Sequence, residues 1–171
     1  MGDPKRPRKT FTKPKSPWRT DQLAQELYLL GSYGLRNKRE LWKSQTRLSD
    51  IRKQARRLLA ASEDIRLREE KKLLDSLKRK GLVGETVTLD DVLGLSVEDM
   101  LGRRLQTVVF RKGFAVSPAH ARQLITHGHI RIAERVVTIP GYEVTAEEDG
   151  RIQLFAPEPG EAPKQAPAVA K

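Results

Sequence analysis

Cysteine is absent from this 171-residue chain, aromatic residues make up only 5% of it, and no long apolar run occurs. Without cysteine there are no disulfides, no thiolate zinc sites and no cysteine nucleophiles. A membrane span needs about 18 to 20 consecutive apolar residues, and a secretory signal needs an apolar stretch behind a basic N-terminus. We therefore expect a soluble, cytoplasmic protein with a modest core and no membrane partner.

Positive charge is in excess, and it is not gathered in one place. The chain has 33 Lys and Arg against 22 Asp and Glu, a formal net charge of +11. Residues 36–80 hold sixteen basic and seven acidic side chains, residues 81–102 hold five acidic and no basic ones, and residues 103–135 hold seven basic and one acidic. A non-specific basic tail usually keeps its charge in one terminal block. The alternation indicates several surfaces that meet one extended polyanion, although charged helices can also be plain solvated faces.

The N-terminal part of the chain divides into an arm and a helical region. Residues 1–19 contain four prolines and no apolar periodicity, so we expect an extended basic arm that is disordered until a partner orders it. Residues 20–102 are expected to form a helical subdomain, in which the longest helix carries an apolar stripe from Leu41 to Leu59. Apolar spacing and capping residues predict helices over 21–30, from 37 onward, over 62–80 and 88–94, and from 96 to just before 113.

The C-terminal part of the chain mixes a helix with short strands. Ser117-Pro118 is a cap residue followed by proline at the first helical position, and short β-branched stretches at Ile130, 136–139 and 152–155 predict a small antiparallel sheet. The predicted fold class is therefore α+β, with a compact helix-helix-strand module over residues 103–155. Residues 156–171, rich in proline and alanine, are expected to be a flexible tail.

The segment from Arg104 to Tyr142 resembles the RNA-binding module named after small-subunit ribosomal protein S-four. It has an Arg-Leu pair that opens the first helix, a glycine turn, a Ser-x-x-x-Ala-Arg-Gln-Leu second helix, and then a strand, a turn and another strand. Two departures stand out: Gln106 where the family commonly has aspartate, and Ala133-Glu134 where it has Asn-Gly or Ala-Gly. Because glycine takes a positive φ without cost, Glu134 predicts a different or wider turn.

The order of arm, helical subdomain and module is similar to that of the ribosomal protein itself, in the archaeal and eukaryotic branch that lacks N-terminal cysteines. The resemblance implies a structural, non-enzymatic constituent of the small ribosomal subunit. It implies direct binding to ribosomal RNA, support of early body assembly and translational accuracy, and a position near the path by which messenger RNA enters. Its partners would be small-subunit ribosomal RNA and neighbouring ribosomal proteins, with no cofactor, no metal and no homo-oligomer.

A different class of function is also open: a free-standing, ribosome-associated RNA-binding factor of the heat-shock type. Chains of that type are usually shorter and begin with the module, whereas this one places 102 residues ahead of it. An enzymatic role is disfavoured, because the chain has no phosphate-cradling glycine loop, nucleophile elbow or zinc-protease helix. The acidic residues between 90 and 99 are explained by two capping positions.

The candidate RNA-binding residues are basic or hydrogen-bonding side chains in the arm, the longest helix and the module. On a helical wheel His120, Gln123 and His127 share a face, and Arg104 and Arg111, seven residues apart, are expected to align. Three histidines without a carboxylate partner make a zinc site a weak alternative, and Trp42 is expected to pack rather than to stack on a base. The full set is Lys5, Arg6, Arg8, Lys9, Lys13, Lys15, Lys43, Arg47, Lys53, Arg56, Arg103, Arg104, Arg111, Lys112, Ser117, His120, Arg122, Gln123, His127, His129, Arg131 and Arg135.

Overall fold

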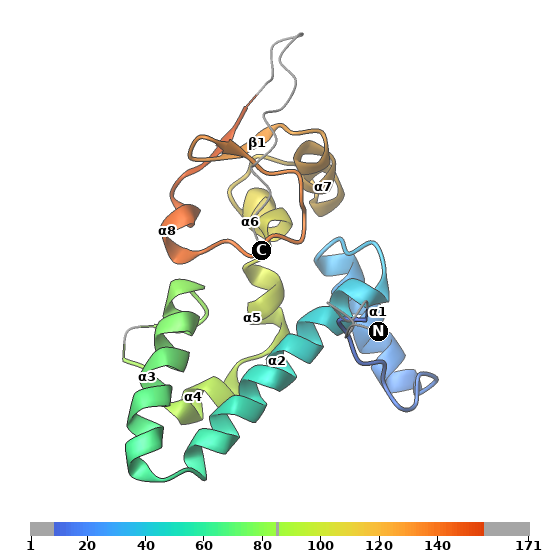
Figure 1. Cartoon of the computed structure of the whole chain (residues 1–171). Coiled ribbons are helices and arrows are strands. Elements are labelled where there is room, and N and C mark those ends of the chain that lie inside the picture. Colours follow the sequence, from blue (N-terminus) through green and yellow to red (C-terminus); the bar gives the residue numbers. More distant parts are fainter. Residues whose placement is uncertain (1–8, 85, 156–171) are drawn as a thin grey trace, which may run out of the picture.

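The computed structural model describes residues 9–84 and 86–155 (Figure 1). A helical half is followed by a smaller half that combines helices with a three-stranded antiparallel sheet, so the predicted α+β class is confirmed. No helix in the described part of the chain is both long and apolar enough to cross a membrane. The elements are α1 (Thr20–Ser32), α2 (Lys38–Leu59), α3 (Glu63–Arg79), α4 (Leu89–Gly94), α5 (Val97–Gly102), α6 (Leu105–Arg111), α7 (Pro118–Thr126), β1 (Ile130–Ile132), β2 (Arg135–Val136), α8 (Ala146–Asp149) and β3 (Ile152–Leu154).

The helical half is built around α2, which forms a hairpin with α3 and also packs on α1, α4 and α5 (Figure 1). Helix α2 begins where its cap predicts, because the Asn37 side chain accepts a hydrogen bond from the backbone N–H of Glu40. Its apolar stripe is buried as expected at Leu41, Leu48 and Ala55. The stripe ends early, since Leu59 at the tip of the hairpin is 37% exposed.

The predicted single helix from 96 to 113 is wrong, because the chain leaves the helical path after Gly102 and resumes it at Leu105. The backbone groups at this break form hydrogen bonds with residues 140–144. The Leu105 N–H donates to the Tyr142 carbonyl at 2.8 Å, and the Val144 N–H donates to the Arg103 carbonyl at 2.9 Å. An extended segment from far along the chain, bridged to Arg104 at Glu143, thus replaces one turn of helix. The two capping boxes that open α4 and α5, at Thr88 and Ser96, are confirmed.

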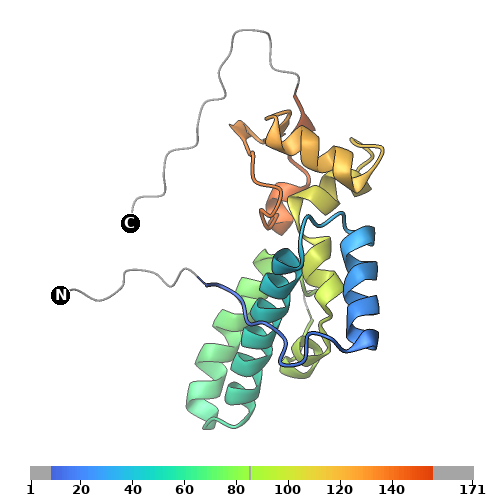
Figure 2. The ribbon, with the colours of Figure 1, turned by 90° about the vertical axis from the view of Figure 1, so that its right-hand side faces the viewer.

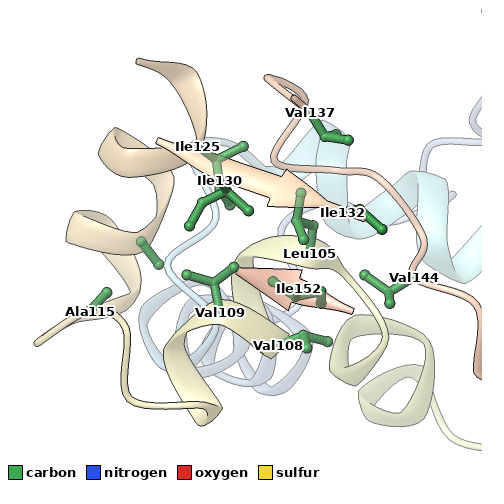
Figure 3. Close-up of a cluster of buried hydrophobic side chains, with 11 residues drawn as sticks. Leu105, Val108, Val109, Ala115, Ile125, Ile130, Ile132, Val137, Val144 and Ile152 are labelled. Carbon is green, nitrogen blue, oxygen red and sulfur yellow. The ribbon is translucent and has the colours of Figure 1, made fainter. Parts of the chain in front are cut away.

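The sheet of the smaller half has the strand order β2-β1-β3. Its inner face packs against α6 and α7, and buried apolar side chains of these elements form the core of the module (Figure 3). Ile130, Ile132 and Ile152 supply the sheet's share of this core. Of the strand predicted over 136–139, only Val136 lies in β2, and the Val137 N–H adds one further hydrogen bond to the Ile130 carbonyl at 3.2 Å.

The turn between β1 and β2 is no wider than a two-residue hairpin loop, since Ile132 pairs with Arg135. The expectation of a wider turn is therefore wrong. The turn is no longer than the Asn-Gly or Ala-Gly turn of the family and differs from it in having Glu134 at the second position. Ala133 takes a φ of +54°, the left-handed region that glycine enters without cost. Among the described residues it is the only non-glycine with a positive φ.

The described part of the arm, residues 9–19, contains no helix or strand and contacts α2 through Phe11 and Thr12 (Figure 2). The Phe11 ring stacks on the Trp42 ring with centroids 5.9 Å apart, and the Thr12 N–H donates to the Thr46 hydroxyl at 3.0 Å. An aromatic anchor that the sequence pattern did not reveal thus docks the arm. The predictions for residues 1–8, including Lys5, Arg6 and Arg8, and for the tail 156–171 lie outside the described residues.

Candidate nucleic-acid interface

The two halves of the molecule are joined at Glu40, in the first turn of α2. Its carboxylate accepts a hydrogen bond from Arg104 Nη2 at 2.7 Å and from Arg122 Nη2 at 2.5 Å. Arg104 precedes α6 and Arg122 lies on α7, so one carboxylate holds both helices of the module. Burial opposes ionisation of Glu40, but the hydrogen bonds and charges of the two arginines outweigh it, and the net effect lowers the pKa of Glu40.

Gln106, one of the departures from the family pattern, completes this junction. Its side chain is fully buried, and its Nε2 donates to the Gly34 carbonyl at 2.8 Å and to the Pro118 carbonyl at 2.9 Å. Its Oε1 accepts from Arg122 at 3.3 Å. Gly34 has a φ of +58°, and a Cβ there would lie 2.6 Å from the Pro118 side chain. The loop between α1 and α2 therefore approaches α7 closely, and Gln106 satisfies the carbonyls that meet there.

These contacts correct the expectation for Arg104. It does not align with Arg111 as an exposed pair on one helix: it is 7% exposed and points to Glu40, whereas Arg111 is exposed at the end of α6. Burial lowers the pKa of Arg104 and Glu40 opposes this only in part, so the pKa is lowered on balance, and the guanidinium stays charged at neutral pH. Removing Arg104 or Arg122 would thus disturb the junction as well as any contact with RNA.

Several other candidate cations also face carboxylates of their own chain. Arg103 and Lys112 both bind Asp149, with N–O distances of 3.2 and 3.0 Å. Arg135 lies 3.5 Å from Glu148, and Arg47 pairs with Glu143. Within residues 103–135, five of the seven basic side chains therefore have a carboxylate partner, and Arg111 and Arg131 have none among the described residues. The acidic partners were missed in the sequence, because these pairs join segments that are far apart along the chain.

In the helical half, the candidates without a carboxylate partner in the described region lie on the arm and on α2. On α2 they are exposed and lie away from the buried stripe, and Lys9 of the arm lies over the Phe11 ring. Arg39 and Arg57, which sequence reasoning left out, share this exposure and lack of a partner. The unpaired candidates of the helical half are Lys9, Lys13, Lys15, Lys43, Lys53 and Arg56.

Helix α7 presents the predicted polar face, and its cap fixes the first part of it. The Ser117 hydroxyl accepts from the His120 N–H, and the Val116 N–H donates to His120 Nδ1 at 3.4 Å. In the neutral ring the proton is therefore on Nε2. Gln123 and His127 follow along the same face and are exposed. His127 also lies near His129, with ring centroids 6.5 Å apart.

One alternative raised by the sequence, the role of Trp42, is settled by the geometry. Trp42 packs: its Nε1 donates to Glu26 at 3.0 Å while its ring faces Phe11, so the prediction of a packing role is confirmed. Glu26 is buried, and although burial raises its pKa, hydrogen bonds from Trp42 and Lys38 lower it on balance. No group of three or more histidine and acidic side chains in the described part of the chain is placed to hold a metal ion.

Comparison with known proteins places this arrangement in a family. The profile of the ribosomal protein S4/S9 N-terminal domain matches residues 5–102, and that of the S4 domain matches residues 103–149. The chain is 57% identical to a small ribosomal subunit protein uS4 of Cenarchaeum symbiosum over 155 residues, which cover 90% of this chain and 75% of the relative. It is 54% identical to the uS4 of Ignicoccus hospitalis, covering 87% and 90%, and 52% identical to that of Hyperthermus butylicus, covering 92% and 89%.

Proposed function

Because the chain belongs to the ribosomal protein S4 family, we propose that it is a structural constituent of the small ribosomal subunit and binds ribosomal RNA directly. The observation that carries this proposal is the match over both halves, at 52% to 57% identity, to proteins named small ribosomal subunit protein uS4. The surface fits the role, because the arm and α2 carry exposed cations that have no carboxylate partner among the described residues. Such cations neutralise phosphates and release counterions.

The RNA surface that we propose has two parts. The helical half offers charge through Lys43, Lys53 and Arg56, which serve phosphates of any sequence. The module offers donors and acceptors along α7, through Gln123 and His127, which suit ribose hydroxyls and exposed base edges. Because the Glu40 junction ties α2 to α7, both parts meet the RNA in one relative position. A folded RNA with a matching shape is then preferred over an unstructured one.

The finer parts of the proposal rest on the family resemblance. They are a role in early assembly of the body and in translational accuracy, a position near the path of incoming messenger RNA, and contacts with neighbouring ribosomal proteins. We also propose a cytoplasmic, ribosome-bound, monomeric and non-enzymatic protein. The heat-shock type of factor is not favoured, because residues 5–102 match a ribosomal-protein domain.

Two charge-matched double variants test the proposed surface. Lys53→Ala with Arg56→Ala removes two unpaired cations of α2, and Arg66→Ala with Lys72→Ala removes two cations of α3 that pair with Glu70 and Glu69. Affinity for small-subunit ribosomal RNA is measured between about 50 and 200 mM salt. We expect the α2 variant to reduce the slope of log affinity against log salt by about 1.4 to 1.8, and the α3 variant to change it much less. Equal effects of the two variants, or wild-type binding that does not prefer the ribosomal RNA to a scrambled RNA of equal length, would contradict the proposal.

A further inference from the structure

The outer face of the small sheet carries an unusual row of side chains. Arg131 lies opposite Val136 of β2 and Gln153 of β3, and neighbours directly across a sheet share a face. Ile130 and Ile132, on either side of Arg131, point into the core, so this row points away from it. Phe155 follows Gln153 by two residues, and its N–H donates to the His129 carbonyl at 2.7 Å, which continues the pairing. His129 and Phe155 therefore extend the same outer face.

Arg131 is held on this face by an aromatic ring instead of an anion. Its guanidinium carbon lies 3.4 Å from the centre of the Phe155 ring. Its Nε is buried and has no hydrogen-bond partner. Two other arginines in the described region, Arg52 and Arg104, also have an unpaired buried Nε, but each donates through another nitrogen, to the Leu95 carbonyl and to Glu40. No side-chain hydrogen bond and no ion pair of Arg131 occurs within residues 9–84 and 86–155.

We propose that the Arg131–Phe155 stack is a seat for one unpaired nucleobase of the RNA. This inference rests on the proposed function and names the chemistry of one contact within it. Planar guanidinium and phenyl groups accept the face of any base, and such stacking does not depend on its sequence. Gln153, which is exposed beside the stack, and His129 at its edge can hydrogen-bond the base or its ribose.

A phosphate is the competing ligand for an unpaired guanidinium, and the geometry favours the base. A guanidinium that binds phosphate does so with its edge, in the plane of its N–H groups. Here the guanidinium carbon lies over the Phe155 ring at 3.4 Å, and the Nε edge is buried without a partner. A lysine at this position would keep the charge and lose the plane. The two ligands are therefore distinguishable by one conservative substitution.

The test uses the full chain and two probes of known structure: a single-stranded adenosine decamer with 2-aminopurine at its centre, and a 10-base-pair RNA duplex. The variants are Arg131→Lys and Phe155→Leu, with Arg66→Lys on α3 as the matched control. We expect both sheet variants to weaken decamer binding by about 5- to 150-fold, the range for one stacked base, and to reduce the change in 2-aminopurine fluorescence that accompanies binding. Duplex binding and the salt slope are expected to change less than twofold, and the control to match the wild type.

The opposite results overturn the inference. Wild-type affinity and a wild-type change in 2-aminopurine fluorescence in both sheet variants would show that no base stacks there. A phosphate contact would give a different pattern. Arg131→Lys would then bind as the wild type does, whereas Arg131→Ala would weaken binding of decamer and duplex alike and lower the salt slope by about one. Thermal unfolding of each variant within a few degrees of the wild type confirms that the sheet is intact. If the proposed function itself failed, the wild type would not prefer small-subunit ribosomal RNA to a scrambled RNA, a result independent of these variants.

Discussion

Glu40 does more for this molecule than its position in the first turn of α2 would indicate. One carboxylate neutralises two guanidinium groups that come from two helices of the module, and it is 64 and 82 residues away from them in the chain. The Arg104 side chain is only 9% exposed, so loss of its partner would leave a buried charge without compensation. Breaking a buried ion pair in this way costs far more than breaking an exposed one.

Glu40→Gln tests this role directly. We expect it to lower the free energy of unfolding by about 2 to 4 kcal/mol, because Arg104 and Arg122 lose their counterion in a desolvated site. The matched control is Glu143→Gln, which removes a carboxylate from the more exposed pair with Arg47 and is expected to cost less than about 1 kcal/mol. Urea unfolding measures both. A Glu40→Gln variant as stable as its control would refute the proposed junction.

The pH dependence of stability gives a second test at the same residue. The pKa of Glu40 is lowered below its ordinary value of 4.5 in the folded protein, so its ion pairs stabilise fully above the unfolded pKa and are lost as the pH falls through the folded one. The stability difference between wild type and Glu40→Gln should therefore be constant from pH 6 to 8 and shrink below about pH 4. Glu26, Glu148 and Asp149, whose pKa values are also lowered, cancel in this difference. A difference that grows on acidification would mean that the pKa of Glu40 is raised.

At this scale the sequence could place residues on faces but could not pair them. It predicts that His120, Gln123 and His127 share one side of α7, because a helix fixes that relation locally. It could not show that Arg104 and Arg122 form ion pairs with Glu40, because Glu40 lies on another helix. Gln106 was recognised only as a departure from a pattern. Its three backbone acceptors, at Tyr33, Gly34 and Pro118, come together only in the folded chain.

The helices are the elements that the sequence predicts best, and the break between α5 and α6 shows where such prediction fails. The starts of α2, α4 and α5 are set by capping side chains within three residues of the helix. The end of α5 is set by the 140–144 segment, whose carbonyls and N–H groups replace helical ones at Arg103 and Leu105. The local sequence pattern carries no information about a segment about 40 residues away that competes for these hydrogen bonds. The apolar spacing runs on through the break and therefore predicts one continuous helix.

Two contributions of the arm can be tested separately: its positive charge, which we expect to bind RNA, and the stacking of Phe11 on Trp42, which attaches it to α2. Deleting residues 1–15 removes six candidate cations and should lower the salt slope of RNA binding by about 4 to 5. Phe11→Ala keeps all six and removes only the stacking on Trp42, so it should leave the slope unchanged and reduce stability by about 1 kcal/mol. RNA titrations at several salt concentrations and urea unfolding separate the two effects. A deletion that leaves the slope unchanged would remove the arm from the RNA surface.

On the scale of the whole molecule, the arrangement explains why so basic a chain has so many of its own charges paired. The acidic side chains at Glu40, Glu143, Glu148 and Asp149 hold cations at the contacts between the halves and within the module. The unpaired cations of the described region lie outside those contacts. The basic side chains therefore fall into two groups. Those paired with carboxylates stabilise the fold, and those without such a partner are available to a polyanion.

The most direct test of the whole account is sedimentation of the chain, expressed at its natural level with a small epitope tag, through a sucrose gradient in high salt. We expect it to travel with the small ribosomal subunit at one copy per particle and to stay there after the salt wash, as a resident constituent does. A chain that is washed into the free fractions, or that travels with only a small share of the particles, would contradict the claim that it is a structural part of the subunit.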